Sequence, residues 1–79
     1  MVYPNPATNN TTISFISTKG NKYTIEITDL KGKILERIKG ISSSAQTNLI
    51  LDVSKYTKGV YLINLIDENG KRSIKMNRQ

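Results

Sequence analysis

The sequence predicts an all-β domain, an antiparallel β-sandwich of about seven short strands. Short segments rich in Val, Ile, Thr and Tyr recur along the chain, and these side chains pack well on a pleated sheet. Turn signals separate the segments about every 8–12 residues, a spacing typical of sandwiches. No stretch shows the apolar period of a long helix.

In the first half of the chain, strands are expected at residues 2–3, 11–16, 22–28 and 33–39, with residues 7–12 mostly a polar loop. Residues 22–28 alternate most cleanly, which predicts one buried face and one face in water. The inward residues of this strand would be Tyr23, Ile25 and Ile27. A hairpin turn should follow, with Gly32 available for positive φ. The imperfect alternation of residues 33–39 predicts a bulge or an edge position.

The second half of the chain is expected to hold strands at residues 48–51, 59–66 and 71–76. Residues 40–47 are small and polar, which predicts a loop or a weak strand. Residues 52–58 should form a turn or a single helical turn, because Asp52 can accept hydrogen bonds from the amides that follow it.

Residues 59–66 form the longest apolar run, and only Asn64 interrupts it. Apolar side chains at both parities predict a central strand with both faces covered. Tyr61 should pack its ring inside and donate its hydroxyl to a backbone partner. A hairpin over Asp67–Gly70 should then lead to the last strand.

Composition limits the chemistry that the chain can perform. Its 79 residues contain neither Cys nor His, which removes thiol chemistry, disulfides and the commonest general base. The six carboxylates are scattered over strands and turns, with no juxtaposed pair suited to acid–base work. Residues 67–70 faintly resemble a calcium loop, but the other ligands are missing. We therefore expect no enzyme activity, no metal site and no cofactor.

The net charge of +6 favours anionic partners, although a solvated basic surface is the simpler interpretation because the charges are spread. No membrane span and no signal peptide are visible. The chain begins abruptly, so we interpret residues 1–79 as a single domain from a longer protein.

Three motifs occur in order: Val2-Tyr3-Pro4-Asn5-Pro6 at the start, Asp29-Leu30-Lys31-Gly32-Lys33 after an alternating strand, and Leu51-Asp52-Val53-Ser54 leading to Gly59-Val60-Tyr61-Leu62-Ile63. A strand with basic residues then ends the chain. In this order and spacing, the sequence resembles the type A C-terminal sorting domain of the type IX secretion system of Bacteroidota. The resemblance covers essentially the whole chain.

This resemblance implies an Ig-like antiparallel sandwich that is fused behind a cargo protein and carries no catalysis. It implies that the cargo reaches the periplasm, that the outer-membrane translocon then recognises the domain, and that the protein ends at the cell surface or in the medium. A sortase-like surface peptidase would usually remove the domain.

The resemblance also implies which residues form the sorting motif and contact the translocon. They are Pro4, Asn5, Pro6, Gly59, Tyr61, Lys71, Arg72, Ile74, Lys75 and Met76. A structural role competes with each assignment: the Pro-Asn-Pro stretch could be only a stiff corner, and Tyr61 only a core residue. Lysines on the last strand could serve only to prevent edge-to-edge aggregation.

A second functional hypothesis is an Ig-like binding module for carbohydrate or anionic polymer, motivated by the basic excess. The shortage of aromatic residues argues against it, because sugar and single-stranded nucleic-acid platforms need exposed rings, and no nucleic-acid partner is expected. Exposed sheet edges would also allow strand-mediated self-association.

Overall fold

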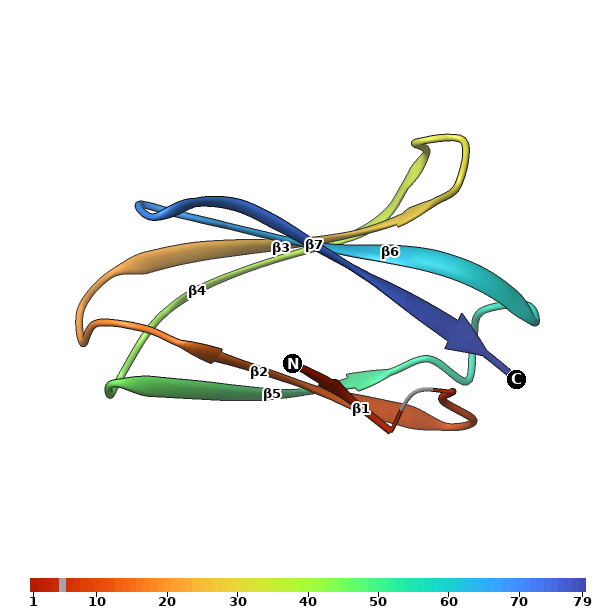
Figure 1. Cartoon of the computed structure of the whole chain (residues 1–79), viewed down its shortest axis with the longest axis horizontal. Coiled ribbons are helices and arrows are strands. Elements are labelled where there is room, and N and C mark those ends of the chain that lie inside the picture. The colour runs from red at the N-terminus through yellow and green to blue at the C-terminus, as the bar shows by residue number, and fades with distance from the viewer. Residues whose placement is uncertain (5) are drawn as a thin grey trace.

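The computed structural model describes residues 1–4 and 6–79, which form two antiparallel sheets packed face to face (Figure 1). The strands are β1 (Val2–Tyr3), β2 (Asn10–Ile16), β3 (Lys22–Asp29), β4 (Ile34–Ile41), β5 (Gln46–Asp52), β6 (Gly59–Asp67) and β7 (Gly70–Arg78). One sheet has the order β1-β2-β5 and the other β4-β3-β6-β7. The predicted all-β sandwich of about seven strands is confirmed.

The core lies between the two sheets, where alternate side chains of each strand meet. The most deeply buried large side chains come mainly from the central strands of the larger sheet and from β7: Ile25, Ile27, Ile63 and Met76. The smaller sheet contributes Val2, Ile13, Phe15 and Leu51. Neither sheet could bury these apolar faces alone, so their packing holds the layers together.

The hairpin of β3 and β4 follows the sequence prediction. Gly32 adopts a φ of 89°, and the Asp29 carboxylate accepts hydrogen bonds from the amides of Lys31 and Lys33, both at 2.9 Å. The pairing register shifts between Ile27 and Thr28, and β4 lies at the edge of its sheet. The irregular pattern of β4 therefore reflects both a bulge and an edge position.

Residues 40–47, expected to be a loop or a weak strand, hold the ends of two strands around a short loop, and the expected polar loop of residues 7–12 is more ordered than predicted. β4 continues to Ile41 and β5 begins at Gln46, because these residues pair with Lys22 and Ile16 of neighbouring strands. Ala7, expected in a polar loop, is fully buried and forms a parallel bridge with β7. In both places the main chain pairs with another strand, although the local sequence has only a weak preference for strand structure.

Residues 53–58 connect the two sheets as a turn. Asp52 accepts hydrogen bonds at its Oδ1 from the Ser54 amide (2.9 Å) and the Ser54 hydroxyl (2.6 Å). This is the turn alternative, with the expected side-chain acceptor, and the described residues of this connection contain no helical turn.

β6 is central in its sheet, with β3 on one side and β7 on the other. The expectation that both of its faces are covered was wrong. One face is buried, whereas Val60, Leu62 and Ile66 on the other are only half-buried. The reason is that a two-layer sandwich places nothing over the outer face of either sheet. Asn64, the polar residue in the run, is buried there and accepts a hydrogen bond from the Ser73 hydroxyl at 2.6 Å.

Candidate functional site

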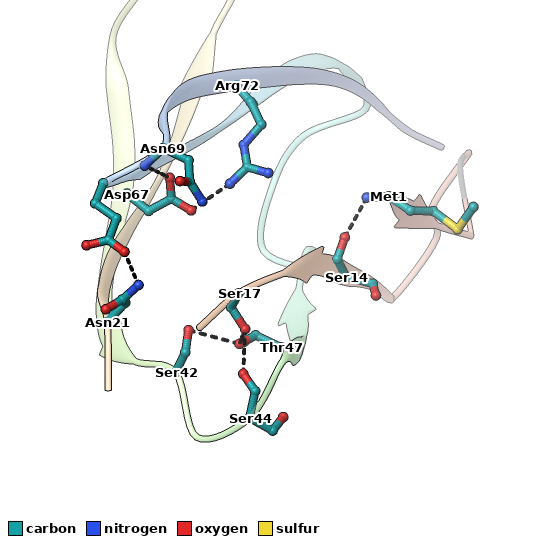
Figure 2. Close-up of polar contacts among 11 residues, drawn as sticks. Met1, Ser14, Ser17, Asn21, Ser42, Ser44, Thr47, Asp67, Asn69 and Arg72 are labelled. Atoms are coloured by element: carbon teal, nitrogen blue, oxygen red, sulfur yellow. Dashed lines mark hydrogen bonds and ion pairs between the residues drawn. The ribbon is translucent and has the colours of Figure 1, made fainter. Parts of the chain in front are cut away.

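β7 is an edge strand that pairs along its whole length with β6. The turn before it pairs Asp67 with Gly70, so the predicted hairpin is confirmed. The Asp67 carboxylate accepts a hydrogen bond from the Asn69 amide at 2.9 Å and binds Arg72 at 2.6 Å (Figure 2). The Asp67 side chain is only 7% exposed, so Arg72 is engaged in stabilising the turn.

The two faces of β7 have different environments. Lys71 and Lys75 lie opposite Ile66 and Leu62 on the outer face of the sheet, where their side chains are exposed. On the inner face Met76 is 0% exposed, whereas Ile74 is 36% exposed at the rim of the core. Met76 is therefore a core residue in the folded domain.

The C-terminal end of β7 is tied to the rest of the molecule. The Ala7 amide donates to the Asn77 carbonyl, and the Gln79 amide donates to the Ala7 carbonyl, both at 2.8 Å. Arg78 donates from Nε to the Val53 carbonyl at 2.8 Å. Sequence reasoning missed these contacts, because neither Ala7 nor Val53 carries a local signal for a partner about 25 or more residues away in the chain.

The proline motif lies close to this anchored end. Pro4 and Pro6 are exposed, and the Pro4 carbonyl accepts a hydrogen bond from the Thr11 hydroxyl at 3.0 Å. Asn5, the third predicted residue of the motif, lies outside the described residues. Because Ala7 follows Pro6 directly, the fold brings the first predicted motif beside the end of the last strand.

Gly59 and Tyr61 begin the central strand and lie opposite β7. Gly59 has a φ of 153°, which residues with a side chain rarely adopt, and it pairs with Arg78. Tyr61 is 7% exposed and pairs with Met76. Its hydroxyl donates to the Thr57 carbonyl at 2.5 Å, which confirms the predicted backbone partner.

A polar cluster fixes the connection between β5 and β6 against the edge strand β4. Tyr56 donates a hydrogen bond from its hydroxyl to Glu36 at 2.5 Å, and Lys55 lies 3.1 Å from the same carboxylate. The Tyr56 hydrogen bond, with Lys55, holds the pKa of Glu36 below its usual value. Burial and the neighbouring carboxylate raise the pKa of Tyr56. These groups stabilise the connection through mutual contacts.

Ionisable groups are otherwise dispersed in the part of the chain that the structure describes. There, no three His, Cys, Asp or Glu side chains gather into a potential metal site. A helix with the length and apolar character to cross a bilayer is also absent from residues 1–4 and 6–79.

Comparison with known protein families matches residues 1–77 to the family described as "Secretion system C-terminal sorting domain". The match covers all three predicted motifs and β7 as far as Asn77. The chain belongs to this family. No curated protein was found to match the chain.

This sorting domain is a C-terminal signal for type IX secretion, as the resemblance predicted. Its family consists of targeting signals and is not an enzyme family. Such a domain implies a type IX system, a cargo fused on its N-terminal side, and export toward the cell surface or the medium. The alternative of a carbohydrate or anionic-polymer module receives no support from the match.

Proposed function

We propose that the type IX outer-membrane translocon recognises this sorting domain at β7. The single observation that carries the proposal is the position of β7. It is a basic edge strand, and among the residues that the structure describes, Ala7 pairs with its outer edge at the C-terminal end only. In this proposal residues 1–79 act as one domain of a longer exported protein. That protein passes through the periplasm, and a sortase-like surface peptidase then removes the domain.

Main-chain direction supports recognition by strand addition. The Asn77 carbonyl and the Gln79 amide bond to Ala7, so the main chain of these residues points away from β6. Main-chain groups alternate in direction along a strand, so those of Lys71 and Ser73 point toward the same edge. An extended segment of the translocon could pair there, because edge addition supplies affinity through backbone hydrogen bonds.

In this proposal the side chains of β7 have different roles. Lys71 and Lys75 would set the orientation of the partner strand through their charge, and Ile74 would offer an apolar contact at the rim. Arg72 would act by holding the turn before β7 through its ion pair with Asp67. Met76 and Tyr61 are buried, so they would act by holding β7 in place. Gly59 would help by starting β6 in the required register.

The proline motif has a different part in the proposal. Exposed Pro4 and Pro6 would stiffen the chain where it leaves β1 and enters the rest of the domain. The peptidase would act on the N-terminal side of β1.

The test is secretion of a Sec-exported reporter followed by residues 1–79 in a bacterium with a type IX system. Lys71→Glu/Lys75→Glu should lower the reporter in the medium at least tenfold and leave it in the periplasm, because the charge that orients the partner is reversed. The matched control is Lys31→Glu/Lys33→Glu, which places the same charge change in the exposed turn between β3 and β4. Equal secretion of both double variants, each folded by circular dichroism, would refute recognition at β7.

A further inference from the structure

An open apolar cleft of about 400 Å³ lies where one edge of the sandwich is incomplete. Its lining comes from β2 and β5 in the smaller sheet and from β6 and β7 in the larger sheet. The lining residues include Met1, Phe15 on β2, and Ile74 and Arg72 on β7. The two sheets are not equally long here, because β1 comprises only Val2–Tyr3.

The pairing register shows what would close this cleft. Val2 lies opposite Ile13, and the Met1 amine donates to the Ser14 carbonyl at 2.6 Å (Figure 2). The Ser14 amide donates back to the Met1 carbonyl at 2.7 Å. Met1 and Ser14 therefore form a hydrogen-bonded antiparallel pair. A residue directly ahead of Met1 would lie opposite Phe15, and the one before it opposite Ile16.

The main chain of β2 is oriented so that it can pair with a longer β1. Main-chain groups alternate along a strand, so the amide and carbonyl of Ile16 point to the same edge as those of Ser14. Side chains alternate too, and Val2 faces the core while Met1 is exposed. The residue directly ahead of Met1 would thus face the core, into the cleft beside Phe15 and Ile74.

We propose that the segment joining the cargo to the sorting domain continues β1 along β2, and that its last residue fills this cleft. The inference rests on the sorting function, because the family places the cargo on the N-terminal side of the domain. Extending β1 orders the two or three residues of the connection nearest the domain. Those residues are then protected from proteolysis, so a surface peptidase would cut farther toward the cargo.

Two extensions of the chain with identical composition test the register. Thr-Thr-Val ahead of Met1 places Val opposite Phe15 and toward the core, whereas Thr-Val-Thr places it opposite Ile16 and toward water. Urea denaturation should show an unfolded population about tenfold smaller for Thr-Thr-Val, equivalent to about 1.4 kcal/mol. Hydrogen exchange at the Ile16 amide should slow at least tenfold relative to the chain without an extension.

A double-mutant cycle tests whether the stability difference between the two extended chains comes from contacts in the cleft. Ile74→Ala removes one wall of the cleft, so it should reduce the difference between the two extensions by at least threefold. Equal midpoints for the two extensions, or unchanged exchange at Ile16, would overturn the proposal. Dimers of both extended chains by light scattering would also overturn it, since a second copy would then cover the cleft. None of these measurements depends on secretion. A negative result would therefore contradict the extension of β1 without contradicting recognition at β7.

Discussion

Individual tyrosines show how the same residue type serves different purposes in a small core. Tyr61 and Tyr56 lie with ring centroids 5.3 Å apart, and each hydroxyl has a specific acceptor. Phe15 and Tyr23 meet edge to face at 5.4 Å at another part of the core. Tyr3, in contrast, is exposed. The rings thus stabilise the sandwich and leave little aromatic surface for a ligand.

The Tyr61 hydroxyl should contribute measurably to stability. We predict that Tyr61→Phe lowers the free energy of unfolding by about 1–2 kcal/mol, because the part-buried Thr57 carbonyl loses its donor. Urea denaturation measures this change. Tyr3→Phe, at an exposed tyrosine, is the matched control and should leave stability unchanged within about 0.5 kcal/mol. A similar loss in both variants would contradict the assignment.

The depressed pKa of Glu36 predicts a pH-dependent contribution. A carboxyl group with a lower pKa in the folded state stabilises the fold above its unfolded pKa, and this stabilisation is lost as pH falls through the folded value. Glu36→Gln should therefore be less stable than the parent at pH 7, and the difference should shrink below the ordinary value of 4.5. Denaturation midpoints between pH 7 and pH 3 test this, and a constant difference would disprove it.

At the scale of the element, β7 has a structural role and, in the proposed function, would also carry recognition on the same strand. Its inner face supplies Met76 to the core, and its hairpin is stabilised by the Arg72–Asp67 ion pair. Its outer face presents lysines beside the half-buried face of β6. Removing the strand would therefore disturb folding as well as recognition, which is why single side-chain changes are the sharper tests.

Two substitutions on the inner face of β7 should differ in how much they lower the free energy of unfolding. Met76→Ala is expected to cost about 2–5 kcal/mol, because it opens a cavity at a fully buried position. Ile74→Ala should cost less, because that side chain is partly exposed at the rim of the cleft. Thermal and urea denaturation of both variants provide the comparison. Equal costs would show that β7 is not packed as described.

At the scale of the whole molecule, the fold joins the two ends of the chain. Ala7 pairs with Asn77 and Gln79, while Arg78 reaches the connection between β5 and β6. These contacts link the two sheets beyond their shared apolar core, and the chain has no Cys with which to form a disulfide. In the proposed function, the connection to cargo and the recognition strand thus lie on the same side of the domain.

Arg78 should stabilise this junction more than an ordinary surface arginine does. Arg78→Gln is expected to lower the free energy of unfolding by about 1.5–3 kcal/mol, the range for a hydrogen bond with a charged donor. Arg37→Gln is the control, because Arg37 is exposed and pairs with Glu26 on the sheet surface, where such pairs contribute about 0–1 kcal/mol. If the control loses as much stability, the junction has no special role.

Much of the fold and part of the site could be predicted because the signals are local. Period-2 alternation located β3, and the Asp and Gly residues of the turns located both hairpins. The outer face of β6 was misjudged, because an apolar side chain does not reveal whether another layer lies above it.

The sequence by itself determined the strands, the turns and the family, since each depends on residue types at short spacing or in a fixed order. Only the tertiary structure decided which strands are edges and that Met76 is buried while Ile74 is at a rim. It also decided that Ala7 covers the end of β7 and that a cleft remains beside β1. Those features depend on pairings between residues far apart in the chain, which no local pattern specifies.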